Sequence, residues 1–348
     1  MVSSVIDDRA REVLKSLIHL HIVTGEPVGS ESLARALNRA MSPATLRNIM
    51  ADLEKRGYLD HPHTSAGRVP TDEGYRVYVN SLMERETLPA EDAAAVDSSL
   101  RADGTPTRVL EKASHILSQM SGSIGFVLAP ESGRSRFMHI DLVRLPHPRV
   151  LVVMVSLSGL VTNRVIEVEE QLSQDELQAC ANYLNVHFAG MPLAGIRARL
   201  LDLMGEEKAL YDSLLKKVVS VGERAFDTAG DAAGDVYLDG TANIFEQPEF
   251  EDVSRMRELF KTFEEKSRLV RILNACISGE GVRITIGHEN EDPRLHNLAV
   301  VTAGYPLLGD AALGLGVLGS TRMEYARVVA LVDHVARAVR RTLLELQP

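Results

Sequence analysis

The first eighty residues carry their apolar side chains at helical spacing. An apolar stripe near the N-terminus predicts a helix that ends before Gly25 and Pro27, and the stripe comprises Ala10, Val13, Leu14, Leu17 and Ile18. Residues 30–38 predict a second, shorter helix with Ser30 as its N-cap. Residues 42–57 predict a third helix, since Pro43 suits its first position and Gly57 suits its end.

The third predicted helix has two distinct faces. Its buried face comprises Leu46, Ile49, Met50 and Leu53, spaced at i, i+3, i+4 and i+7. Ser42 can cap the helix, and Thr45, Arg47 and Asn48 lie opposite the apolar stripe near its N-terminus. Because a recognition helix contacts base edges with residues near its N-terminus, this pair of short helices predicts a helix-turn-helix. The alternative is a packing unit whose polar face is only solvated.

A tract without acidic residues follows, between Asp60 and Asp72. Residues 58–60 and 68–70 predict the two strands of a hairpin, with a tip in which Gly67 lets the backbone turn or approach closely. DNA phosphates are contacted by hydroxyl groups, arginines and backbone N–H groups, so an acid-free tip suits a wing that lies against DNA. The candidate contacts are His63, Thr64, Ser65 and Arg68. Thr71 then caps a further helix.

The remaining two-thirds of the chain alternates between helical and strand patterns. Residues 84–105 predict an acidic connector with one helical turn or more, and residues 107–122 predict an amphipathic helix. Three further strands predict an antiparallel meander at 137–145, 149–157 and 160–168, and Ser173 with Glu176 forms a capping box for the next helix. Helices are then predicted at 195–204, 208–226, 253–266 and 267–278, strands at 282–287, 298–305 and 313–319, and a closing helix at 323–346. This order predicts an α+β, multidomain chain.

Composition and charge narrow the class of protein. The chain has 348 residues and a formal net charge of -10, which taken alone argues against nucleic-acid binding. Residues 35–80 reverse that sign, with seven basic and five acidic residues. The sequence contains neither a signal peptide nor a run of about 18 apolar residues, so we expect a cytoplasmic protein that does not span a membrane. Cys180 and Cys276 have no CxxC partner and are predicted to be buried, unpaired hydrophobes.

Signals for catalysis and cofactors are weak. His61 and His63 have no further Cys or His nearby, so no metal site is predicted. The sequence GLGVLG, from Gly314 to Gly319, matches G-x-G-x-x-G, but it lies within a predicted strand rather than between a strand and a helix. A nucleotide-dependent enzyme is therefore a remote alternative, and we expect no enzyme activity and no cofactor.

Several motifs together resemble the HrcA family of heat-inducible transcription repressors. They are TGEPVGSESLA, SPATLRNIMADLEKRGYL and PHTSAGRVPTDEGYRVYV within residues 5–82, and more weakly GVLGSTRMEYARV near the C-terminus. The resemblance implies an N-terminal winged helix-turn-helix and a GAF-like regulatory domain interrupted by an inserted α/β dimerisation domain. The expected boundaries are 1–83 for the winged helix, 84–105 for a linker, 106–139 and 241–348 for the GAF-like domain, and 140–240 for the insertion.

The resemblance also implies a function and partners. Such a repressor binds an inverted-repeat DNA operator upstream of chaperone genes as a homodimer, occludes the promoter, and is released under heat stress. A GroEL-type chaperonin is the implied folding partner, and either titration of that chaperonin or melting of the repressor itself gives the same release. A winged-helix scaffold for protein interactions is the competing function. The predicted DNA-binding residues are Ser42, Thr45, Arg47, Asn48, His63, Thr64, Ser65 and Arg68.

Overall fold

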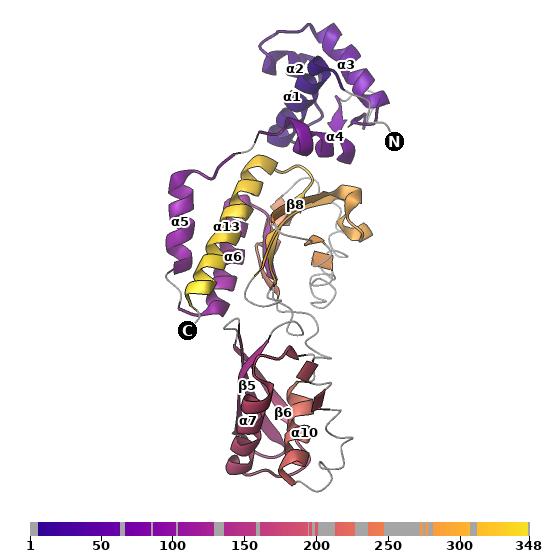
Figure 1. Ribbon diagram of the computed structural model, residues 1–348. Helices are drawn as coiled ribbons and strands as arrows, with labels where there is room; N and C mark the ends of the chain where they lie inside the picture. The colour runs from indigo at the N-terminus through magenta and orange to yellow at the C-terminus, as the bar shows by residue number, and fades with distance from the viewer. Residues whose placement is uncertain are drawn as a thin grey trace.

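The computed structural model is an α+β structure in three units that follow one another along its length (Figure 1). We call residues 6–84 the head; the body comprises a five-stranded sheet with helices α5, α6 and α13, and the lower unit comprises a three-stranded sheet with α7 and α10. The structure describes residues 6–62, 67–84, 86–101, 104–128, 136–157, 161–193, 195–196, 199–200, 213–226, 236–246, 272–273, 276–277, 281–306 and 312–346.

The head contains the predicted three helices, a hairpin and a further helix. The elements are α1 (Asp8–Thr24), α2 (Ser30–Ala36), α3 (Pro43–Lys55), β1 (Leu59–Asp60), β2 (Val69–Pro70), α4 (Asp72–Val77) and a π-helical turn, η1 (Tyr78–Leu82). Thr71 caps α4 as predicted, by accepting from the Gly74 N–H group. The prediction for α2 was wrong in one detail, because its N-cap is Gly29 and Ser30 is already inside the helix.

The hairpin is anchored to the loop between α1 and α2. Val28 and Arg68 exchange two backbone hydrogen bonds of 2.8 and 2.9 Å, which add a bridge next to the β1–β2 pair. A Cβ atom on Gly67 would lie 2.3 Å from the Val28 carbonyl carbon, so only glycine permits this approach. The close approach that the sequence suggested at Gly67 is therefore made to the protein's own backbone.

The body is built on a five-stranded antiparallel sheet of order β7-β3-β10-β9-β8. Its strands are β3 (Ile124–Leu128), β7 (Val236–Asp239), β8 (Gly281–Ile286), β9 (Leu298–Pro306) and β10 (Ala312–Ser320). Helices α6 (Pro106–Ser121) and α13 (Tyr325–Glu345) pack on one face of this sheet. Leu273 and Cys276 pack on the other face. Short 3-10 turns complete the body at Thr241–Glu246, Gly287–Glu289 and Pro293–Leu295.

One feature of the body differs from the prediction made from the sequence, and another agrees with it. The segment predicted as a connector contains α5 (Ala90–Arg101), which buries Val96 and Leu100 and reaches α13 through an Asp97–Arg341 ion pair of 3.0 Å. The GLGVLG motif lies inside β10, the central strand, as predicted. A Cβ atom on Gly314 would lie 2.3 Å from the Ile277 side chain, so this glycine allows close packing rather than forming a phosphate loop.

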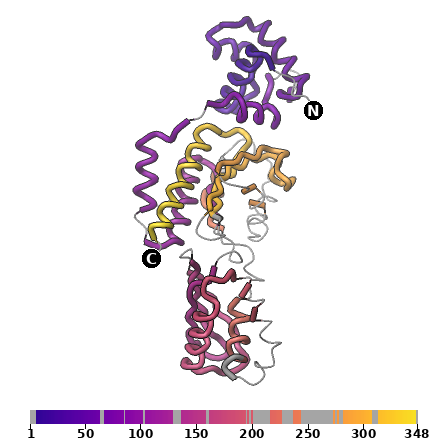
Figure 2. Tube along the Cα trace, viewed as in Figure 1, coloured from indigo at the N-terminus to yellow at the C-terminus, as the bar shows by residue number. Residues whose placement is uncertain are grey.

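The lower unit has its own hydrophobic core. The predicted meander is confirmed as β4 (Phe137–Arg144), β5 (Arg149–Ser156) and β6 (Val161–Glu167), and one face of this sheet is covered by α7 (Gln174–Phe188) and α10 (Ser213–Ala225). The predicted capping box of Ser173 and Glu176 is present. The lower unit lies at the opposite end of the molecule from the head (Figure 2).

Both cysteines are buried and unpaired, as predicted. Burial raises the pKa of the Cys180 and Cys276 thiols to about 11, which keeps them protonated near neutral pH.

Candidate nucleic-acid interface

The N-terminal turn of α3 is held by its own cap. Ser42 Oγ accepts a hydrogen bond of 3.1 Å from the Thr45 N–H group and lies 2.9 Å from Thr45 Oγ1. Pro43 occupies the first turn, where an N–H group would have no partner within the helix. The two hydroxyl groups are therefore fixed at the exposed start of the helix.

The two faces of α3 separate as the sequence predicts. Leu46, Met50 and Leu53 are buried against the rest of the head, while Ile49 is half-buried. Thr45, Arg47 and Asn48 are exposed. Within the described residues, the Arg47 and Asn48 side chains make no hydrogen bond or ion pair, so their donors and acceptors are free for a ligand. Arg presents a planar fork of donors and Asn presents one donor and one acceptor group, which are the groups that pair with base edges.

The hairpin provides a second element beside α3, but only part of it lies among the described residues. His63, Thr64 and Ser65, predicted as phosphate contacts, lie outside them. Arg68 is described, and its guanidinium is paired with Glu54 on α3, with Nε and Nη2 at 2.7 and 2.6 Å from Oε2. The Arg68 side chain is only 17% exposed.

Arg68 therefore connects the hairpin to α3. Sequence reasoning missed Glu54, which contributes the acidic half of this contact. The available signal was an acid in the last turn of α3, where Lys55 and Arg56 suit the helix dipole and Glu54 does not.

A joint of charged contacts fixes the head on the body. Asp72 Oδ2 accepts from the His288 N–H group at 2.9 Å and lies 2.7 Å from His288 Nδ1. Arg76 donates from Nε to Glu289 at 2.6 Å and from Nη2 to the Ile284 carbonyl at 2.8 Å. A Cβ atom on Gly287 would lie 2.1 Å from Asp72 Oδ2, so the joint requires glycine there.

A further contact joins the head to the body. Arg322 donates from Nη1 to the Ile22 carbonyl at the end of α1, at 2.8 Å. Through these contacts the position of α3 is tied to the body.

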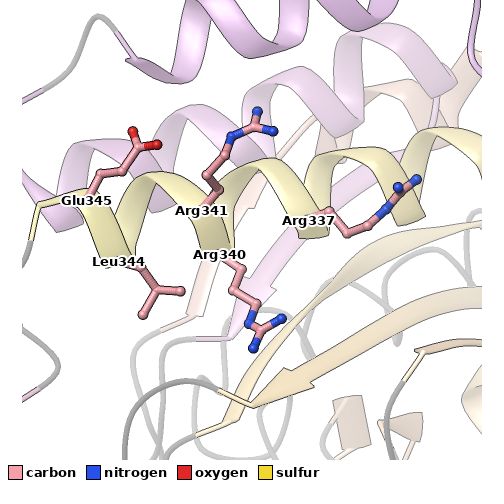
Figure 3. Close-up of a pocket in the computed structure, with 5 residues that line it drawn as sticks. All are labelled: Arg337, Arg340, Arg341, Leu344 and Glu345. Carbon is pink, nitrogen blue, oxygen red and sulfur yellow. The ribbon is translucent and has the colours of Figure 1, made fainter.

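Arginines also gather at the far end of α13, around a cavity of about 350 Å³ (Figure 3). Arg337 pairs with Asp333 at 2.6 Å and Arg341 with Asp97 at 3.0 Å, so their charges are already balanced. Arg340 points to a different side of the helix from Arg341 (Figure 3). This cluster lies near the C-terminus, at the end of the body away from the head (Figure 1), and is the weaker candidate for DNA.

In the part of the chain that the structure describes, no group of three or more His, Cys, Asp or Glu side chains is arranged to hold a metal ion. Within the same residues, no helix is both long and apolar enough to cross a membrane.

Comparison with known proteins places the chain in a family. The family model described as "HrcA protein C terminal domain" matches residues 107–329. A protein of Geobacter sulfurreducens named heat-inducible transcription repressor HrcA is 42% identical over 340 residues, 97% of this chain and 98% of that protein. The chain belongs to the HrcA family. Proteins of the same name from Syntrophobacter fumaroxidans and Xanthomonas axonopodis pv. citri are 36% and 41% identical, over 97% and 96% of this chain and 97% and 95% of their own lengths.

Membership of the HrcA family confirms the resemblance found in the sequence motifs. The members of this family are transcription repressors. A solved structure of a hypothetical protein has the same overall fold, with a TM-score of 0.63 at 21% identity over 98% of this chain and 100% of that one.

Proposed function

We propose that this chain represses transcription by binding an inverted-repeat operator as a dimer and occluding the promoter. The head acts as a winged helix-turn-helix, in which α3 enters the major groove and the β1–β2 hairpin is the wing. The observation that carries this proposal is the free polar end of α3, where Arg47 and Asn48 are exposed and unpaired among the described residues beside a capped helix start. One short recognition helix reads few base pairs, so two heads are needed for specificity.

The domain organisation that we propose follows the hydrophobic cores. The body is the GAF-like domain and the lower unit is the insertion. β7 supports a shorter insertion than the expected 140–240, because Val236–Asp239 pairs with β3 in the body sheet. The lower unit's core runs from Phe137 to Phe226, which favours these limits for the insertion.

The proposed dimer contact is the outer face of the three-stranded sheet. One cross-strand row of this face consists of Val143, Leu151 and Val165, and a second contains Val155 and Val161. Val143, Val161 and Val165 are 43%, 55% and 51% exposed, and the row Asp141, Val153 and Asn163 lies between the two apolar rows. Exposed apolar side chains gathered on one face often mark an interface. A second copy of the same sheet would cover this apolar patch, and two-fold pairing is the commonest arrangement of a homo-oligomer.

The proposed DNA contacts are Ser42, Thr45, Arg47 and Asn48 on α3, with His63, Thr64 and Ser65 on the wing. For Arg68 we propose a positioning role rather than a direct phosphate contact, since Glu54 already occupies its guanidinium. Family membership supports a GroEL-type chaperonin as the partner that maintains the folded repressor. Loss of that chaperonin under heat and melting of the repressor are the two routes to release.

Footprinting on DNA upstream of chaperone operons tests the proposal. A repressor protects an inverted repeat whose half-sites lie about one DNA turn, roughly 34 Å, or a multiple of it apart. Addition of the chaperonin separates the two release routes. If release follows from titration of the chaperonin, added chaperonin should restore protection of the operator after heating, whereas release by melting of the repressor should not depend on the chaperonin. A protein scaffold would protect no sequence in preference to another.

A further inference from the structure

The β8 strand lies at an open edge of the body sheet. Among the described strands it pairs only with β9. Its other edge faces a cavity of about 870 Å³ between η1 of the head, β8 and the first turns of α13. An unpaired strand edge presents N–H and C=O groups that can add another strand.

Two side chains reveal which backbone groups of β8 face the cavity. The Ile284 carbonyl accepts from Arg76, and the Ile286 N–H group donates to Glu289 Oε2 at 2.8 Å. In an antiparallel strand, alternate residues direct both backbone groups to the same side. Val282, Ile284 and Ile286 therefore face the cavity, whereas Arg283 and Thr285 face β9. Among the described residues, the Val282 N–H and C=O groups and the Ile284 N–H group have no partner, and they remain for a ligand.

The cavity walls suit the side chains of an extended peptide. Val79, Met83 and Val329 line it with apolar surface. Three acids and two arginines line the cavity, and of the acids Glu86 is exposed and has no ion pair among the described residues. An added strand would place alternate side chains against this apolar surface, and a basic residue in it would meet the Glu86 carboxylate.

We propose that the β8 edge is a docking site for an extended, basic peptide segment of a partner protein, bound by strand addition. The partner strand takes the free groups of Val282 and Ile284 and competes with Arg76 for the Ile284 carbonyl. Since Arg76 is part of the joint, the added strand loosens the head from the body. The docking itself is independent of the proposed repressor function, and only its effect on operator binding rests on that function.

Hydrogen exchange on the full-length, DNA-free protein tests the docking. The probe is an acetylated, amidated peptide of alternating Val and Lys that matches the six residues of β8. Without it, we expect fast exchange at the Val282 and Ile284 amides and slow exchange at Arg283 and Thr285. With it, Val282 and Ile284 become protected. Unchanged exchange at Val282 and Ile284 would overturn the proposal. Protection that rises with protein concentration in the absence of the peptide would also overturn it, because a second copy of the chain would then occupy the β8 edge.

Matched probes and variants separate strand addition from simple charge attraction. The same peptide with N-methyl groups on alternate amides should not bind, and a Val/Glu peptide should bind more weakly. Arg76→Ala should strengthen binding of the Val/Lys peptide about fivefold, because the peptide then no longer competes with Arg76 for the Ile284 carbonyl. A fivefold change corresponds to about one net hydrogen bond. Glu86→Gln should reduce the preference for Val/Lys over Val/Glu. Equal binding of the N-methylated peptide would contradict the proposal without bearing on operator recognition.

Discussion

At the scale of single residues, the Arg68–Glu54 pair joins the hairpin to the last turns of α3. An acid-free loop suggests from sequence that Arg68 is a phosphate ligand, but the structure pairs it with an acid fourteen residues earlier in the chain. No local pattern predicts which acid an arginine will meet across a turn. The helix caps at Ser42 and Thr71 were predictable because a cap depends only on residues within one turn.

The pairing leads to a prediction for two substitutions. Arg68→Ala and Glu54→Gln should each weaken binding to operator and non-operator DNA by similar factors, because both release the hairpin from α3. Neither should change the slope of log affinity against log salt. Each should lower the free energy of unfolding by about 0.5–1.5 kcal/mol. Arg56→Ala, which breaks the more exposed Arg56–Asp52 pair, is the stability control.

DNA titrations at several salt concentrations, with thermal unfolding alongside, provide the measurement. Two results together would show instead that Arg68 contacts a DNA phosphate directly. Glu54→Gln would bind DNA more strongly, and Arg68→Ala would lower the slope of log affinity against log salt by about one unit.

At the scale of elements, the sequence predicted those whose pattern is complete within the element. The amphipathic α3 and the β4–β6 meander are of this kind, since their periodicity and turns are local. The order of the body sheet was not predictable, because β10 pairs with β3 across an intervening unit with a separate core. Helix α5 was only partly predicted, because the burial of Val96 and Leu100 depends on packing in the body next to α13, which is distant in the sequence.

The outer face of the β4–β6 sheet supports a prediction about assembly. Val165→Glu places a charge at the β6 end of the row Val143, Leu151 and Val165, where it would be buried without a partner in a dimer. The variant should be monomeric by light scattering at concentrations where the native protein is dimeric, and its circular dichroism should be unchanged. Thr162→Glu is the control, since Thr162 is exposed on the same strand with its side chain on the other face. A dimeric Val165→Glu protein would show that another surface holds the two copies together.

At the scale of the whole molecule, the joint between head and body sets where α3 can reach. Gly287→Ala would drive a Cβ atom into the Asp72 carboxylate, while Gly281→Ala meets no atom of the described residues within 4 Å. Both glycines have positive φ, of 52° and 101°, and only the first lies in the left-handed region that alanine can adopt, so Gly281→Ala carries at least as much backbone strain as Gly287→Ala. Gly287→Ala should lose operator affinity and show a wider spread of head positions by small-angle scattering, with non-specific DNA binding retained. Equal effects from both variants would mean that backbone strain, and not the joint, is responsible.

The central claim is that the exposed N-terminal face of α3 reads operator bases, and substitution of Arg47 and Asn48 tests it most directly. Arg47→Ala and Asn48→Ala should each cost about 1–3 kcal/mol of operator binding free energy and relax discrimination at one position in each half-site. Their melting temperatures should barely move, because both side chains are exposed. Arg108→Ala, an exposed arginine at the start of α6 in the body, makes the same charge change and should leave operator affinity unchanged. Wild-type affinity and discrimination in both α3 variants would contradict the account.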